Sequence, residues 1–172
     1  MRDEVKDLIA QVKGDDASAR ENAILELMYR MEDSTRQIVK NDVIGDEYLS
    51  KDEQLELIHV LIKLAESLRP EYAGLLWVVS KAEPVIMTDP VQNFVLKHAH
   101  TMPSNMLRNS LVALENCFRV REESDDEAVI KGKFKYEQLR ATLSKIEPQD
   151  QVLLIDDILS DTLSNMEVFY TQ

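Results

Sequence analysis

The chain has 172 residues, enough for a single α-helical domain spanning 1–172 with a substantial buried core. Its 44% hydrophobic and 30% charged residues are typical of a globular protein, and 4 glycines and 5 prolines are too few for the turns of an all-β fold. A net charge of −12 argues against nucleic-acid binding, which requires a field of lysine and arginine side chains.

The acidic charge is concentrated at the two ends of the sequence. Residues 1–60 contain 15 acidic and 8 basic side chains, residues 61–120 contain 5 and 6, and residues 121–172 contain 12 and 6. A solvated surface accounts for much of this charge. An acidic surface also attracts a basic protein partner and speeds the encounter at low salt.

Neither a secretion signal nor a membrane span is predicted. Residues 1–10 lack the apolar core of a signal peptide, and Cys117, the single cysteine, has no partner for an internal disulfide. The longest apolar run, Leu75–Val79, is far shorter than the roughly 20 residues that a membrane-spanning helix needs. We therefore expect a cytoplasmic protein that does not enter a membrane.

Helical spacing of apolar residues predicts three helices in the first part of the chain. The first contains Val5–Val12 and ends at Gly14, where glycine supplies the left-handed conformation that closes many helices. Asp15 or Asp16 caps the second, which carries one apolar stripe. A shorter third helix is predicted from about Ser34 to Val43.

The next helix has the clearest start in the chain. Ser50 and Glu53 form a capping box, in which the hydroxyl and the carboxylate each bind one free backbone N–H of the first turn. Apolar residues on two faces between Leu55 and Leu68 predict that this helix is covered on more than one side.

Proline positions and apolar spacing predict further helices after residue 68. Four prolines precede periodic segments and are expected at helix starts, Pro70, Pro90, Pro103 and Pro148. Another helix is predicted around Tyr136–Ile146. Trp77 lies within the longest apolar run and is expected in the core. The chain as a whole is predicted to be all-α.

The region Arg121–Lys133 is predicted to be an exposed acidic loop. It carries the densest group of carboxylates in the chain, Glu122, Glu123, Asp125, Asp126 and Glu127. One interpretation is that this charge serves solubility. The other is that these five residues bind a basic protein partner, and they are the partner-binding residues that the sequence predicts.

Two segments resemble the helix of a HEAT-type repeat. Residues 16–27 have an acidic cap, Asp16, then Arg20, then small and aliphatic residues that would face a neighbouring unit, and the segment from Arg108 is similar. The two arginines are 88 residues apart, about twice a HEAT unit, and residues 52–68 could lie between them. The resemblance implies HEAT-like antiparallel helix pairs in an irregular α-solenoid. The alternative is an irregular helical bundle.

A looser similarity links residues 71–76, Glu-Tyr-Ala-Gly-Leu-Leu, and the helix pair that follows them to small acidic all-helical immunity proteins of bacterial toxin systems. This similarity implies a non-enzymatic inhibitor that binds and neutralises a cognate toxin. Acidic side chains would meet a basic toxin surface, and no cofactor would be needed.

The alternative function is that of a small all-helical Mg-dependent nucleotide pyrophosphohydrolase. Glu53 and Glu56 resemble half of the acidic pattern of those enzymes, and Glu122 with Asp125 has the spacing of the other half. The second pair lies in the predicted loop rather than on a helix, which favours the binding function.

The remaining reactive side chains are interpreted as ordinary structural positions. His59 and Asp157 lack the second set of ligands that a di-iron or a magnesium site needs. Cys117 has no base patterned around it and is expected as a buried small side chain. The preferred interpretation therefore includes no catalytic residue, no metal ligand and no cofactor.

Overall fold

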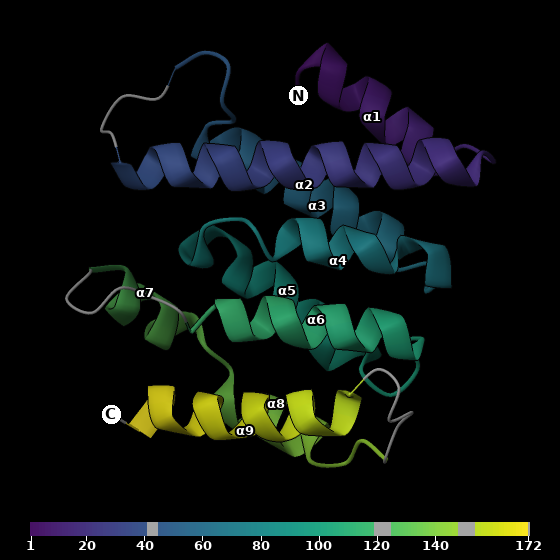
Figure 1. Ribbon diagram of the computed structural model, residues 1–172. Coiled ribbons are helices and arrows are strands. Elements are labelled where there is room, and N and C mark those ends of the chain that lie inside the picture. Colours follow the sequence, from purple (N-terminus) through teal and green to yellow (C-terminus); the bar gives the residue numbers. More distant parts are fainter. Residues whose placement is uncertain (41–44, 119–124, 148–153, 172) are drawn as a thin grey trace.

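The computed structural model describes residues 1–40, 45–118, 125–147 and 154–171. These ranges form nine α-helices and one short 3-10 helix and contain no strand, which confirms the all-α prediction for this part of the chain (Figure 1). The elements are α1 (Asp3–Lys13), α2 (Ala17–Lys40), α3 (Lys51–Ala65), η1 (Pro70–Tyr72), α4 (Ala73–Val79), α5 (Pro84–His98), α6 (Ser104–Asn116), α7 (Asp125–Lys133), α8 (Tyr136–Leu143) and α9 (Ile155–Thr171).

Four helices, α2, α4, α6 and α9, lie side by side in one layer and run in the same direction (Figure 1). We call this the front layer. Behind it lie α3, α5 and α8, and α3 packs against α4 and α5. At one end of the layer α1 packs on α2, while α7 packs on α5 at its edge. Each front-layer helix therefore keeps one face that points away from its neighbours.

Asparagine side chains hold α6 against α4. Asn109 Nδ2 donates to the main-chain oxygen of Ala73 at 2.9 Å, and Asn116 Nδ2 donates to that of Ser80 at 2.9 Å. Both hydrogen bonds join residues that are 36 positions apart. The two helices are therefore parallel and keep a constant register.

The helices α2 and α4 approach each other closely at Gly74. A Cβ at this position would lie 3.0 Å from Cγ2 of Ile24, so a larger residue would have to displace that side chain. Two turns further along, Lys81 Nζ lies 3.8 Å from Glu32 Oε1. The two contacts place these helices in parallel register as well.

One continuous cluster of buried apolar side chains joins the described helices other than α7, from Val5 on α1 to Met166 on α9. Removing this surface from water, at roughly 25 cal/mol per Å², is the main stabilising contribution to such a fold. Within the described ranges, no helix combines the length and the hydropathy needed to cross a bilayer.

The predicted boundaries of the early helices are largely confirmed. The capping box of Ser50 and Glu53 is present at the start of α3, and Asp16 Oδ1 accepts a hydrogen bond from Ala19 N at the start of α2. Gly14 follows α1 as predicted, but its φ of −69° is extended rather than left-handed. The end of α1 therefore does not depend on the conformational freedom of glycine.

The separate helix predicted from Ser34 is wrong, because α2 continues without a break to Lys40. Ser34 Oγ donates to the main-chain oxygen of Arg30 at 2.6 Å and accepts from Leu49 N at 2.8 Å. The hydroxyl therefore bonds within the preceding turn and to a distant segment, and it does not cap a new helix at this position. Residues 41–44 of the predicted element lie outside the described residues.

The prediction that Pro90 starts a helix is also wrong. The helix α5 begins at Pro84, and Pro90 lies inside it. An internal proline removes one N–H donor. Burial of Met87, Val91 and Val95, on a helix packed between α3 and α6, offsets that loss. The predicted helix starts at Pro70 and Pro103 are confirmed, and Pro148 lies outside the described residues.

The loop predicted over Arg121–Lys133 is wrong for the part that the structure describes, which is helical. Residues 125–133 form α7, which is stabilised by the fully buried Ile130 and by an ion pair of 2.8 Å between Glu127 and Lys131. Residues 121–124 lie outside the described residues.

The two segments that resemble a HEAT-type helix lie on α2 and α6, both in the front layer. The helix between them is α4, whereas residues 52–68 form most of α3, behind the layer. The two arginines also have different partners. Arg20 donates to the main-chain oxygens of Val12 and Gly14, while Arg108 donates to Asn109.

Candidate protein-binding surface

An exposed tryptophan lies at the centre of the front layer. The side chain of Trp77 on α4 is 39% exposed, which contradicts its predicted place in the core. Neighbouring helices cover the other sides of α4 and bury Leu75, Leu76, Val78 and Val79. The open side of α4 therefore carries Trp77 and Lys81, four residues apart, whereas Gly74 packs against Ile24 of α2.

Two further apolar side chains are exposed on α2, the helix that packs beside α4. Leu25 is 38% exposed and Tyr29 is 52% exposed. Leu25 shares a helix face with Glu32, which meets Lys81 of α4. The contacts at Gly74 and Lys81 place Trp77 beside the part of α2 that carries both side chains. We call Leu25, Tyr29 and Trp77 the Trp77 surface.

Charged side chains border the Trp77 surface on one side. The ammonium group of Lys81 lies 6.0 Å from the centre of the Trp77 ring, within range of a cation–π interaction. Glu32 also accepts a hydrogen bond of 2.9 Å from Arg36. An apolar centre with a charged border is the usual composition of a protein-binding surface.

A groove of about 300 Å³ lies on the same layer, between α6 and α9. Seven residues line it, Val112, Glu115, Asn116, Ile158, Asp161, Thr162 and Asn165, and none of these seven is cationic. Thr162 is 1% exposed, and its hydroxyl has no hydrogen-bond partner among the described residues. Asn165 Nδ2 donates to Glu115 Oε1 across the groove at 2.5 Å.

No family model, curated protein or solved structure matches this chain.

The described part of the predicted acidic site lies on α7, a different helix from those that carry the Trp77 surface. Glu122 and Glu123 lie outside the described residues, and Asp125, Asp126 and Glu127 form the first turn of α7. This helix lies at the edge of the front layer (Figure 1). Their role in partner binding stays a prediction.

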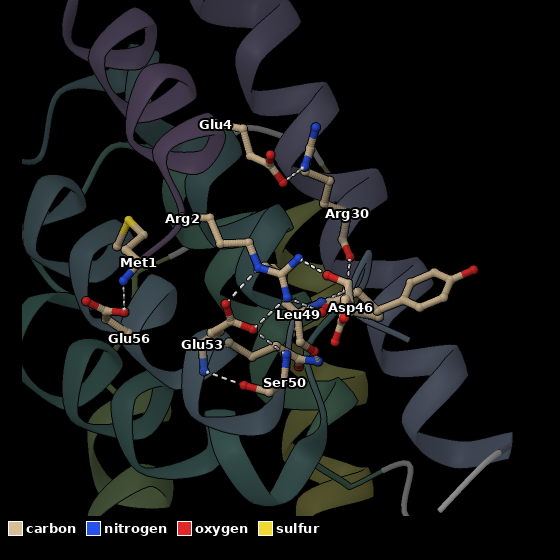
Figure 2. Close-up of polar contacts among 12 residues, drawn as sticks. Met1, Arg2, Glu4, Arg30, Asp46, Leu49, Ser50, Glu53 and Glu56 are labelled. Atoms are coloured by element: carbon tan, nitrogen blue, oxygen red, sulfur yellow. Dashed lines mark hydrogen bonds and ion pairs between the residues drawn. The ribbon is translucent and has the colours of Figure 1, made fainter. Parts of the chain in front are cut away.

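The acidic pair of the enzyme alternative belongs to an ion-pair network at the N-terminal end (Figure 2). The guanidinium of Arg2 donates to both carboxylate oxygens of Glu53, at 2.7 and 3.0 Å, and to the main-chain oxygens of Asp46 and Tyr48. Hydrogen bonding to Arg2 lowers the pKa of the Glu53 carboxyl to about 2. Glu53 is thus held as an anion by a neighbouring cation.

Glu56, the second member of that pair, also has a cationic partner. Its Oε2 lies 2.9 Å from the amino group of Met1 (Figure 2). Among the described residues, no group of three or more His, Cys, Asp or Glu side chains is arranged to hold a metal ion. Asp125 of the second acidic pair starts α7, which packs on α5. This geometry gives the enzyme alternative no support.

Cys117 is a buried structural side chain, as predicted. It is fully buried, and its Sγ lies 3.4 Å from the main-chain oxygen of Ala113. Burial raises the pKa of the thiol to about 12, so the nucleophilic thiolate does not form at neutral pH.

Sequence reasoning missed the Trp77 surface because the run Leu75–Val79 is apolar without periodicity. The spacing of Leu25 and Tyr29, four residues apart, was the available sign that α2 exposes an apolar stripe.

Proposed function

We propose that this protein is a non-enzymatic binding protein that docks a protein partner on the front layer, around Trp77. The observation that carries the proposal is the exposure of Trp77 on α4, together with that of Leu25 and Tyr29 on the neighbouring helix α2. Tryptophan and tyrosine contribute more to binding energy at interfaces than most other residues. Exposed apolar groups with a polar border commonly mark interaction sites.

For the architecture we propose a degenerate HEAT-like array, an irregular α-solenoid. Successive helix pairs α1–α2, α3–α4 and α5–α6 each contribute their second helix to the front layer, which supports this proposal. The spacing is uneven: 50 positions separate Ile24 from Gly74, and 36 separate Ala73 from Asn109. Because the helix pairs are not evenly spaced in the sequence, an irregular helical bundle is the alternative architecture.

For the partner we propose a basic protein, and most specifically a bacterial toxin that this chain neutralises as an immunity-type inhibitor. The net charge of −12 supports a basic partner, because opposite charge accelerates association. An inhibitor of this type performs no chemistry, which is consistent with Glu53 and Glu56 having cationic partners.

A photo-crosslinking amino acid at position 77 tests the site in cells of the source organism. We expect it to join the chain to one protein, whereas the same group at exposed Gln138 on α8, behind the front layer, should not. The affinity of the purified partner is then measured. Trp77→Ala should weaken binding at least about tenfold, and Val129→Ala, an exposed apolar residue on α7, should leave it unchanged.

The same assay separates the Trp77 surface from the predicted acidic site. A triple reversal of Glu122, Glu123 and Asp125 to lysine should slow association if those residues contact a basic partner. An affinity unchanged by Trp77→Ala but reduced by the triple reversal would reject the Trp77 surface. Coexpression with the toxin-like product of an adjacent reading frame tests the inhibitor role, since wild type should rescue growth.

A further inference from the structure

We infer that the groove between α6 and α9 receives an arginine side chain of the protein partner. This inference rests on the proposed function, since the groove and the Trp77 surface lie on the same layer. It adds the chemical identity of one contact. The partner would therefore cover α4, α6 and α9 together.

The groove is rich in hydrogen-bond acceptors. The amide nitrogens of its two asparagines are already used, Asn116 Nδ2 by the main-chain oxygen of Ser80 and Asn165 Nδ2 by Glu115. One N–H of each amide is thus engaged within the protein, and each amide oxygen can act as an acceptor for a ligand. The Asp161 carboxylate and the Thr162 hydroxyl supply further acceptor positions.

An arginine side chain is the complement of this arrangement. Its guanidinium has five N–H donors, no acceptor and a permanent positive charge, so it can bind acceptors on both helices at once. Val112 and Ile158 are the apolar residues of the groove, and the aliphatic stem of an arginine can pack against them. None of the seven lining residues that the structure describes is cationic, so none of these repels the guanidinium.

The buried hydroxyl of Thr162 supports the same assignment. Among the described residues, Thr162 is the uncharged residue of the lining whose buried side-chain polar atom has no hydrogen-bond partner. A buried hydroxyl without a hydrogen bond is costly. A guanidinium donor would remove that cost when the partner binds.

The probe for this inference is N-acetyl-L-arginine methylamide, titrated into the ¹⁵N-labelled full chain at low ionic strength and followed by NMR. We expect saturable shifts of the backbone amides that line the groove. The citrulline counterpart has nearly the same shape without the charge, and it should produce no saturable shift there. The lysine counterpart should bind more weakly, because it has three donors on a single atom.

Two substitutions identify the groove as the binding site. Asp161→Asn should weaken arginine binding about two- to fivefold, whereas Asp157→Asn, one turn earlier on α9 and outside the groove, should not change it. Thr162→Val keeps the shape of the side chain and should also weaken binding. Because it removes an unsatisfied buried hydroxyl, the fold should remain intact.

Three results would overturn the inference: no shift with the arginine probe, an equal shift with citrulline, or equal effects of Asp161→Asn and Asp157→Asn. The probe does not require Trp77, so Trp77→Ala should leave this titration unchanged. If Trp77→Ala abolishes partner binding while arginine causes no shift, the groove inference alone fails. If arginine binds the groove but position 77 forms no cross-link, the proposed function alone fails.

Discussion

The two ends of the helical stack are attached by different physical interactions. At the N-terminal end, charged groups join α1, α2 and α3 through Arg2 with Glu53 and through Arg30 with Glu4, at 2.7 and 2.9 Å (Figure 2). At the C-terminal end, aromatic rings join the end of α6, the α7–α8 connection and α9, where Phe134 is central.

The aromatic end is a compact ring cluster. The Phe118 ring lies 5.0 Å from the Phe134 ring and 5.3 Å from the Phe169 ring, centre to centre. Beside it, Tyr136 and Tyr170 stack at 4.6 Å. Ring packing depends on shape and apolar area, whereas the N-terminal network depends on charge. We therefore expect the stability of the N-terminal end to depend on pH and salt, and that of the C-terminal end to depend on side-chain volume.

The largest expected effect is that of Phe134→Ala at the aromatic end. Phe134 is 7% exposed and contacts both other rings of the cluster. Truncation of a buried phenylalanine should lower the free energy of unfolding by about 3–5 kcal/mol, measured by urea denaturation. Phe134→Leu should cost clearly less. Equal losses for the two variants would contradict a role for ring volume at this end.

A smaller effect is expected for Arg2→Met at the N-terminal end. The variant keeps much of the aliphatic stem but removes both hydrogen bonds to Glu53. We expect a loss of about 1–2 kcal/mol in urea denaturation at neutral pH. Arg36→Met is the matched control, since its side chain is 62% exposed and its ion pair with Glu32 should contribute under about 0.5 kcal/mol. High salt should shrink the effect of Arg2→Met but leave that of Phe134→Ala unchanged.

The smallest effect is a difference in pH dependence. Arg2 lowers the pKa of Glu53 from 4.5 to about 2 in the folded state, so the stabilisation is complete above about pH 4.5. It is lost as the pH falls from 4.5 toward 2, because the unfolded chain then binds a proton that the folded chain does not. Between pH 6 and pH 3, wild type should lose about 1 kcal/mol more than Arg2→Met. Parallel pH curves for the two proteins would show that this pair does not stabilise the N-terminal end.

Some helix starts could be predicted from local patterns, whereas the false starts at Ser34 and Pro90 lie inside helices that distant contacts extend. The capping box at Ser50 and Glu53 is a four-residue feature, so the start of α3 could be predicted. Ser34 looked like a helix start, but its hydroxyl binds Leu49, 15 residues away, within a continuous α2. The residues around Ser34 in the sequence give no sign of such a distant contact.

The candidate surface was harder to predict, because it depends on which helices become neighbours. Trp77 is exposed because α4 packs on α2 and α6 and leaves one stripe open. The groove joins Glu115 to Asn165, which are 50 positions apart. No spacing rule within one helix connects residues at that separation. The predicted acidic residues, by contrast, follow from composition alone. They therefore indicate the charge of a partner but not the shape of a binding site.

The geometry of the Trp77 surface depends on Gly74, although this residue contributes no side chain to the surface. Adding one methyl group at this position would press on Ile24, and the next residue on α2 is Leu25. The distance between the two halves of the surface is therefore set by the absence of a side chain. A partner that depends on that distance would therefore bind a Gly74→Ala variant more weakly, although the substitution leaves the exposed side chains themselves unchanged.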